Sequence, residues 1–260
     1  MNERALRRTL SDLPLSGVRF YNQIGSTNDV ALAWAAEGAA DLALVIADGQ
    51  TAGRGRLGRK WITPPGAALA FSLVLRPVAE EGGFVALYSA LGALAVVSAL
   101  EEEYGLKPEI KWPNDILVRG RKLCGILAEA VWLGDQAESV ILGIGLNVRP
   151  EAVPAAELLD FPATSLETAI GLSVDRLSLL NDILAALIAW RPRLGSGEFV
   201  QAWEARLAYR GGQVQVWSEG QPIRAGQVEG LDRDGSLRLR SPQGEIFSVR
   251  FGEVHLRPVV

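Results

Sequence analysis

The segment at residues 53–66, GRGRLGRKWITPPG, constrains the fold more than any other part of the sequence. It follows an apolar run at residues 42–47 that reads as a buried strand, and its glycines match the G-x-G-x-x-G spacing of dinucleotide-binding folds. In those folds the glycines open a helix whose N-terminus holds a pyrophosphate. Here Pro64, Pro65 and Gly66 follow, and they cannot continue a helix. The sequence therefore argues against a dinucleotide-binding domain and predicts a loop.

The charge of this loop predicts an anionic ligand. Residues 53–61 contain four Lys and Arg side chains and three glycines, in a protein whose net charge is −4. Arg and Lys bind phosphate and carboxylate oxygens, and glycines let a backbone close over a ligand at low steric cost. We expect a loop that closes over an anion. A solvated basic loop without a ligand is the alternative for this segment taken alone.

The order of the predicted elements indicates an α+β fold. Helices are predicted at residues 27–37, 84–104, 175–194 and 198–207, and strands at 18–24, 42–47, 69–75, 109–112, 116–118, 122–131 and 139–148. Because several strands follow one another through short turns, we expect a mixed or largely antiparallel sheet. Gly143 and Gly145 indicate close backbone approach or a bulge in the last strand.

The C-terminal part of the sequence has a different pattern. After Gly211 and Gly212, short strands separated by turns are predicted at residues 214–217, 222–231, 236–239 and 246–251. This pattern suggests a small SH3-like β-barrel. We therefore predict a larger domain at residues 1–210 and a barrel domain at residues 211–260.

Composition limits the partners and the chemistry. A pI of about 5.3 argues against broad binding to nucleic acid, which needs a basic face. The apolar run at residues 84–100 is shorter than the ~20 residues that span a membrane, so we expect a core helix. With one cysteine, Cys124, and one histidine, His255, the chain offers no disulfide and no histidine-based catalytic pair or metal site. We expect a cytoplasmic protein that binds neither DNA nor a membrane.

Three further polar segments are candidates for ligand contacts. Ser26 begins a predicted helix, where hydroxyl and backbone N–H groups either bind a polar ligand or only cap the helix. Residues 111–115, KWPND, end a strand; their Asp115 either reaches a Mg²⁺ ion, orients a neighbour or belongs to an ordinary turn. Residues 143–147, GIGLN, end another strand with an amide side chain.

In combination these segments resemble the biotin protein ligases. The matching motifs are GSTN at residues 25–28, the segment 50–61, KWPND at 111–115 with KLCGIL at 122–127, and GIGLN at 143–147. The resemblance spans about residues 18–258. It implies a catalytic domain like that of class II aminoacyl-tRNA synthetases, ATP-dependent formation of biotinyl-5'-AMP with Mg²⁺, and transfer of biotin to a lysine of a biotin carboxyl carrier protein.

The resemblance also assigns residues. It implies catalytic roles for Lys111 and Arg56. It implies biotin binding by Ser26, Thr27, Asn28, Gln50, Arg54, Gly55, Arg56, Lys111 and Gly125, and ATP binding by Arg54, Arg56, Trp61, Lys111, Asn114 and Asn147. Leu57 departs from a common arginine of the loop, which puts one loop contact in doubt.

Other readings of the resemblance stay open from the sequence. Some relatives carry an N-terminal DNA-binding domain; here the pattern starts near Val18, so we expect a single-function ligase. A lipoate or octanoate ligase shares the fold, and a non-enzymatic biotin sensor is the rival from another class. The loop arginines with Lys111 favour an enzyme, because biotin's neutral ureido ring needs none of these cations. A homodimer is left open.

Overall fold

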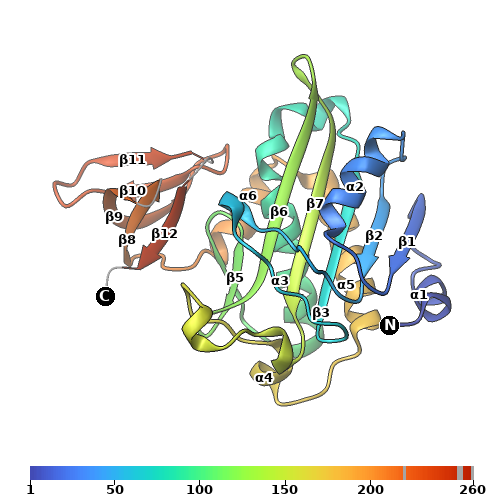
Figure 1. Ribbon diagram of the computed structural model, residues 1–260. Helices are drawn as coiled ribbons and strands as arrows, with labels where there is room; N and C mark the ends of the chain where they lie inside the picture. Colours follow the sequence, from blue (N-terminus) through green and yellow to red (C-terminus); the bar gives the residue numbers. More distant parts are fainter. Residues whose placement is uncertain (219–220, 251–253, 259–260) are drawn as a thin grey trace.

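The computed structural model describes residues 1–218, 221–250 and 254–258, which form two sheets with helices around the larger one (Figure 1). The larger sheet has seven strands in the order β1-β2-β3-β7-β6-β5-β4. Strands β1 and β2 are parallel, and all other neighbouring pairs in this sheet are antiparallel. The strands are β1 (Gly17–Tyr21), β2 (Ala43–Ala47), β3 (Ala68–Leu75), β4 (Glu109–Lys111), β5 (Asp115–Val118), β6 (Arg121–Leu133) and β7 (Gln136–Asn147). The predicted α+β class and mixed sheet are confirmed.

Helices cover both faces of this sheet. Helix α2 (Thr27–Ala36) packs on β2, β3 and β7 in front, whereas α3 (Tyr88–Tyr104) and α5 (Arg176–Trp190) lie behind it (Figure 1). The remaining helices are α1 (Glu3–Thr9), α4 (Leu166–Ile170) and α6 (Gly197–Ala205). Single turns or short runs of 3-10 helix lie at η1 (Arg56–Gly58), η2 (Ala79–Leu87), η3 (Pro150–Ala152), η4 (Ala156–Leu158) and η5 (Arg191–Arg193).

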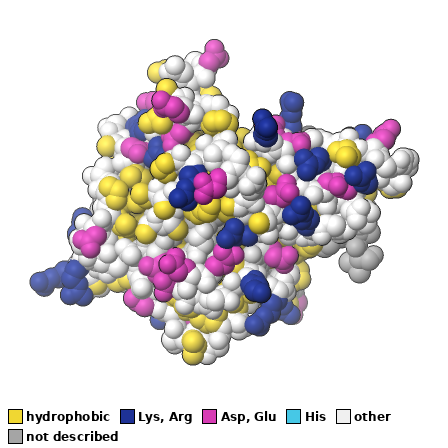
Figure 2. Space-filling view, turned by 180° about the vertical axis from the view of Figure 1, so that it is seen from behind, with side chains coloured by type: hydrophobic (Ala, Val, Ile, Leu, Met, Phe, Trp, Pro, Cys, Tyr) yellow, Lys and Arg dark blue, Asp and Glu magenta, His cyan; other side chains and the backbone are white. Residues whose placement is uncertain are grey.

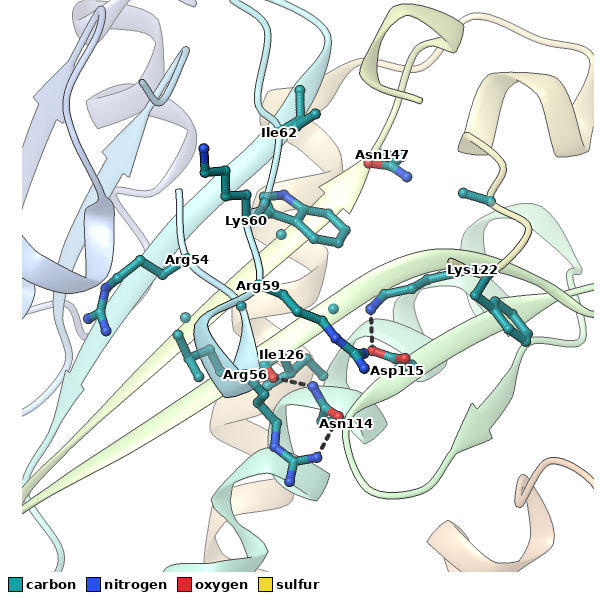
Figure 3. A pocket seen from close by; sticks show the side chains of 18 of the residues that line it. Arg54, Arg56, Arg59, Lys60, Ile62, Asn114, Asp115, Lys122, Ile126 and Asn147 are labelled. Carbon is teal, nitrogen blue, oxygen red and sulfur yellow. Dashed lines mark hydrogen bonds and ion pairs between the residues drawn. The ribbon is translucent and has the colours of Figure 1, made fainter. Parts of the chain in front are cut away.

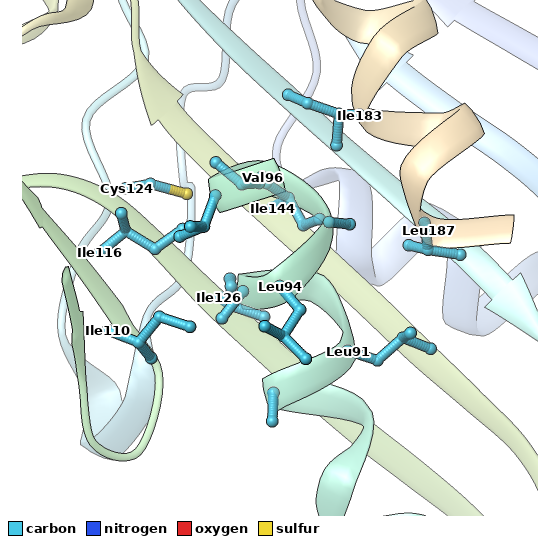
Figure 4. Close-up of a cluster of buried hydrophobic side chains, with 14 of the residues drawn as sticks. Leu91, Leu94, Val96, Ile110, Ile116, Cys124, Ile126, Ile144, Ile183 and Leu187 are labelled. Carbon is cyan, nitrogen blue, oxygen red and sulfur yellow. The ribbon is translucent and has the colours of Figure 1, made fainter. Parts of the chain in front are cut away.

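Helix α3 is the centre of the core. Its Leu91 and Leu94 pack with Ile126 and Ile144 of the sheet and Leu187 of α5 (Figure 4). The helix begins at Tyr88 rather than at the predicted residue 84, because η2 precedes it with a non-helical backbone at Phe84. Within the described residues, one helical stretch, 79–104, has the length and hydropathy of a membrane span, and 72% of its most apolar window is buried here. This burial is what a core helix shows.

The smaller sheet contains the C-terminal strands in the order β11-β10-β9-β8-β12. These are β8 (Gln213–Ser218), β9 (Gln221–Leu231), β10 (Leu237–Arg240), β11 (Ile246–Val249) and β12 (Val254–Pro258). Strand β12 was not predicted; it pairs with β8, far away in the sequence. The predicted strand at 246–251 ends at residue 249 here, and its last residue, Phe251, lies outside the described residues.

The junction between the two sheets touches strand β4. The backbone N–H of Ile110 donates to Arg206 O at 2.6 Å, and the N–H of Ala208 donates to Ile110 O at 3.0 Å. Beyond β4, the indole N–H of Trp112 donates to Gly235 O in the smaller sheet at 3.0 Å. The smaller sheet is therefore fixed beside the strand that ends at Lys111. On the face seen from behind, acidic and basic side chains of the described residues are intermixed (Figure 2).

Candidate functional site

A cavity of about 500 Å³ lies between the loop at residues 53–62, the start of α2, the turn after β4 and the segment at residues 152–163. Its size is in the range of small-molecule sites. Every residue predicted to contact biotin, ATP or a metal lines it, although these residues come from distant parts of the chain: Ser26, Thr27, Asn28, Gln50, Arg54, Gly55, Arg56, Trp61, Lys111, Asn114, Asp115, Gly125 and Asn147. The individual roles of these residues stay predictions.

The start of α2 is held by a glutamine. Ser26 occupies the N-cap position, but its side chain makes no capping hydrogen bond. Instead, the backbone N–H of Thr27 donates to Oε1 of Gln50 at 2.8 Å, and Nε2 of Gln50 donates to Oγ1 of Thr63 at 3.0 Å. Simple capping therefore does not account for Ser26, which is buried at the cavity wall.

The side chain of Asn28 forms its hydrogen bonds with strands β3 and β6 of the sheet rather than with its own helix. Its Nδ2 donates to Oε2 of Glu129 at 2.7 Å and to Leu127 O at 3.4 Å, and its Oδ1 accepts from Oγ of Ser72 at 2.6 Å. A Cβ on Gly143 would overlap Oδ1 of Asn28. Gly143 is therefore required for this side chain to reach the strands.

The ring of Trp61 packs against two further glycines of the sheet, Gly125 and Gly145. A Cβ on Gly145 would overlap its indole nitrogen, and a Cβ on Gly125 would lie 3.1 Å from its ring. The ring therefore packs on bare backbone of β6 and β7, and its buried Nε1 has no hydrogen-bond partner among the described residues. The close approach predicted for Gly143 and Gly145 is confirmed. The alternative of a bulge is wrong, because the register slips only further along, after Val131.

The glycine-rich loop is a narrow hairpin. The N–H of Trp61 donates to Gly53 O at 2.8 Å, and the N–H of Gly55 donates to Arg59 O at 2.7 Å. One 3-10 turn, η1, forms the tip, and Leu57 in it has a φ of 57° and is 46% exposed. The structure confirms that this segment does not open a helix as a dinucleotide fold requires.

Two arginines of the loop have different partners. Arg54 donates to both carboxylate oxygens of Glu129, at 2.9 and 2.7 Å, and lies 2.8 Å from Oδ1 of Asp29. Glu129 thereby raises the pKa of Arg54. The guanidinium of Arg56 is half-buried and donates to Oδ1 of Asn114 at 3.1 Å, and this partial burial lowers its pKa. In Figure 3, Arg54 points away from the cluster that Arg56 and Asn114 belong to.

Two lysines and an aspartate form the charged end of the cavity. Nζ of Lys122 lies 2.5 Å from Oδ1 of Asp115 (Figure 3), and Nζ of Lys111 lies 3.9 Å from Oδ2. Lys111 is only 8% exposed, and its Nζ lies 4.2 Å from the ring centroid of Phe161. Burial lowers the pKa of Lys111 to about 8, against the opposing effect of the Asp115 carboxylate. The site thus holds a cation at low dielectric.

The amide of Asn147 lies at the far wall of the cavity. Its Nδ2 donates to Thr164 O at 3.2 Å, and the residue is 4% exposed at the end of β7. In Figure 3 this fixed amide lies apart from the pair of Lys122 and Asp115.

A magnesium ion held by protein carboxylates does not fit this site. Mg²⁺ prefers an octahedral set of oxygens, drawn from carboxylates, phosphates and water. Asp115 is the carboxylate proposed for it, and both of its oxygens face lysine ammonium groups. Across residues 1–218, 221–250 and 254–258, no group of three or more His, Cys, Asp or Glu side chains could hold a metal.

Sequence reasoning missed two polar residues that line the cavity, Lys122 and Arg59, and one that holds lining residues from outside it, Glu129. Lys122 was named only as part of the motif KLCGIL and was given no role, although a lysine at the start of that motif was a usable signal. Arg59 stood only within the basic loop. Glu129 carried no signal, because its hydrogen bond to Asn28 joins residues 101 positions apart.

Known proteins are similar to this chain in sequence and in structure. The biotin/lipoate A/B protein ligase family matches residues 20–147. The "Bifunctional ligase/repressor BirA" of Bacillus subtilis is 41% identical over 86% of this chain and 70% of its own length. The "Biotin--[acetyl-CoA-carboxylase] ligase" of Mycobacterium tuberculosis is 36% identical over 99% of this chain and 96% of its own.

A solved structure extends the similarity to the whole fold. The "Biotin protein ligase from Aquifex aeolicus in complex with biotin and ATP" superposes with a TM-score of 0.81 at 29% identity, over 94% of this chain and 100% of that one. By sequence, by fold and by the motifs gathered in the cavity, the chain belongs to the biotin/lipoate A/B protein ligase family and, within it, to the biotin protein ligases.

Proposed function

We propose that this protein is an ATP-dependent biotin–[acetyl-CoA-carboxylase] ligase. It forms biotinyl-5'-AMP and transfers biotin to one lysine of a biotin carboxyl carrier protein or domain. The observation that carries this proposal is a cavity in which a fixed network of polar groups at Thr27, Asn28 and Gln50 is joined to a cationic end at Lys111 and Lys122. The first part suits a polar head group, and the second suits a carboxylate meeting a triphosphate.

The cationic end supports the first step. A carboxylate oxygen of biotin attacks the α-phosphorus of ATP, the bond to the β-phosphate oxygen breaks, and pyrophosphate leaves. Negative charge grows on the phosphoryl oxygens, so fixed cations lower the barrier. Lys111 is buried, which strengthens its field, and Lys122 and Arg56 lie in the same cavity. These roles rest on the positions of the side chains.

The second step needs no nucleophile from this chain. The amine of the carrier lysine attacks the acyl carbon of biotinyl-5'-AMP, the bond between that carbon and the phosphate oxygen breaks, AMP leaves, and the amine loses a proton. The mixed anhydride also reacts with water, so the loop at residues 53–62 protects it by covering the cavity.

Magnesium belongs to this proposal as part of the nucleotide. Because the site offers no carboxylate set for it, Mg²⁺ arrives on the phosphates of ATP, where it neutralises charge. Lys111 and Lys122 then face the remaining phosphate oxygens.

The proposal extends to the architecture. Residues 1–210 act as a catalytic domain of class II aminoacyl-tRNA synthetase type, and residues 211–260 as an SH3-like barrel. The mixed sheet with helices on both faces and the separate sheet of short antiparallel strands support this division. A cytoplasmic location is part of the same proposal.

The direct test is transfer to a carrier. We expect the purified protein, with ATP, Mg²⁺ and biotin, to add the mass of one biotinyl group to a biotin carboxyl carrier domain, and to add none when its acceptor lysine is replaced by arginine. Lipoate and octanoate are run in parallel. Transfer of either of these in place of biotin would instead make the protein a lipoate or octanoate ligase. Binding of biotin without any transfer would make it a sensor.

A further inference from the structure

A second cavity, of about 280 Å³, adjoins the larger one. It lies between η2 and the start of α3 on one side and strands β6 and β7 on the other. Ala86 in its wall is exposed and Val140 is buried, so the cavity leads from the surface inward. Most of its wall is apolar, formed by Val85, Ala86, Pro113, Ala128, Ala130 and Val140.

The two cavities meet at a pair of hydrogen-bonded side chains. Arg56, Pro113 and Asn114 line both cavities. Nη1 of Arg56 donates to Oδ1 of Asn114 at 3.1 Å, and Nδ2 of Asn114 donates to Ile126 O at 2.8 Å (Figure 3). The backbone N–H of Ile126 donates in turn to Asn114 O at 2.9 Å. Asn114 is thus fixed to the sheet between the two cavities, whereas Arg56 belongs to the glycine-rich loop.

The apolar wall of the second cavity does not suit the anions of the reaction. ATP, pyrophosphate and AMP carry phosphate charges, and the transfer of such a charge from water to apolar surroundings is costly. The larger cavity, with Lys111 and Lys122, is the one that suits them. The remaining reactant is the acceptor lysine, whose side chain is a flexible stem of four carbons that ends in an amine. Such a side chain suits an apolar passage with a polar inner end.

The inner end of the second cavity favours a neutral amine over an ammonium ion. Apolar walls disfavour the charged form of a lysine, and the guanidinium of Arg56 repels it. The side-chain oxygen of Asn114 has two lone pairs, so it can accept an N–H of the amine in addition to its bond from Arg56. The neutral amine is the form that reacts, because its nitrogen lone pair is free to attack a carbonyl carbon.

We propose that the second cavity is the passage through which the acceptor lysine of the carrier reaches the bound adenylate. The inference rests on the proposed function, because it needs biotinyl-5'-AMP in the larger cavity. The lysine ammonium loses a proton to water as it enters. Its nitrogen then bonds to the acyl carbon, the bond from that carbon to the phosphate oxygen breaks, and AMP leaves with the electron pair. The nitrogen of the new amide gives up a further proton to water.

Filling the passage tests this proposal. Ala130 lines the second cavity and not the larger one, so Ala130→Leu adds bulk to the passage alone. In single-turnover transfer from preformed biotinyl-5'-AMP to the carrier, we expect the maximal rate to fall about tenfold or more, because the reacting nitrogen is misplaced. The carrier concentration that gives half of this rate should stay unchanged. Biotin-dependent exchange between pyrophosphate and ATP should also keep its wild-type rate.

A matched variant and a second nucleophile are the controls. Ala137→Leu adds the same group to β7 outside the lining of either cavity and should leave transfer unchanged. Hydroxylamine has no alkyl stem, so it should discharge the adenylate of Ala130→Leu as fast as that of the wild type. Ala86→Phe narrows the passage from its exposed side, where it does not disturb the core, and should slow transfer to the carrier as Ala130→Leu does.

Three results would contradict the proposal. One is an unchanged maximal rate of transfer in Ala130→Leu and Ala86→Phe. Another is a higher half-saturating concentration of carrier at an unchanged maximal rate, which would mean that this surface only docks the carrier. The third is an equal loss of the reaction with hydroxylamine, which would place the defect at the adenylate itself. If the wild type shows no biotin-dependent pyrophosphate exchange, the proposed function fails, and this inference fails with it.

Discussion

Nζ of Lys122 lies 2.5 Å from Oδ1 of Asp115, and the same carboxylate lies 3.9 Å from Nζ of Lys111. One half-buried carboxylate is thus shared by two cations. A phosphate that enters the cavity competes with Asp115 for both ammonium groups. The arrangement places two ammonium groups where adenylation needs positive charge, and Asp115 pairs with both of them.

Lys111 is expected to act on the transition state of adenylation. Lys111→Gln should keep the fold and lower the rate of biotinyl-5'-AMP formation by about 10²-fold or more, because it removes a cation from the developing phosphate charge. Rapid-quench measurement of adenylate formation checks this, with Lys122→Gln as the parallel variant of the neighbouring lysine. Near-normal adenylation by Lys111→Gln would assign the cationic role to Lys122 alone.

The rate should depend on pH through Lys111. Burial lowers its pKa most, Lys122, Arg59 and Arg257 lower it too, and the Asp115 carboxylate raises it, so that the net pKa is about 8. The charged form is the active one, so kcat/KM for ATP should fall as pH rises through about 8. Asp115→Asn removes the group that raises the pKa and should move this limb to lower pH.

Lys111→Arg supplies the control for the pH profile. A guanidinium stays charged throughout the accessible range, so the descending limb should disappear in that variant. An unchanged limb in Lys111→Arg would show that another group titrates there.

The sequence was sufficient to predict the features that depend on neighbouring residues in the chain. Proline and glycine after the basic loop excluded a dinucleotide fold, and runs of apolar residues located the strands of the larger sheet. What it did not predict depends on contacts between distant segments. Strand β12 forms only because β8 lies beside it, and the polar links of Glu129 join β6 to α2 and the loop. Contacts between segments that are far apart in the chain leave no short-range pattern in the sequence.

The candidate site divides in the same way. The site residues were predicted as a group through the resemblance to the biotin protein ligases, and the structure brings them to one cavity. The hydrogen-bond and ion-pair partners of these residues were not predicted. Arg54 was expected at the ligand, and the structure shows it donating to both carboxylate oxygens of Glu129. The sequence could not predict this pair, because the two residues are 75 positions apart.

Trp112 is expected to couple the smaller sheet to the site. Trp112→Phe removes the N–H that donates to Gly235 O and should lower the free energy of unfolding by about 1 kcal/mol. It should also raise the KM for ATP, since the backbone beside Lys111 is less well held. Urea unfolding and amide exchange at residues 232–236 check this. Unaltered exchange in that turn would mean that the other contacts of the junction suffice.

Arg56 is expected to retain the intermediate. Its guanidinium rests on Asn114 in the structure, at the cavity wall. Arg56→Gly removes a charge-assisted hydrogen bond to the adenylate, worth about 1.5–3 kcal/mol, and should speed release of biotinyl-5'-AMP about tenfold to a hundredfold.

Released adenylate acylates exposed lysines at random, so Arg56→Gly with ATP and biotin should label a bystander such as albumin. Wild-type protein serves as the control. A bystander that stays unlabelled while carrier biotinylation continues would restrict Arg56 to binding of the substrates.

Isotope exchange between pyrophosphate and ATP tests the central claim most directly, because it needs no carrier protein. We expect exchange that depends on biotin and Mg²⁺, is absent with lipoate or octanoate, and is strongly reduced in Lys111→Gln. Exchange with lipoate or octanoate in place of biotin, or no exchange with any of these acids by a protein that binds biotin, would contradict the assignment of this cavity as a site of biotin adenylation.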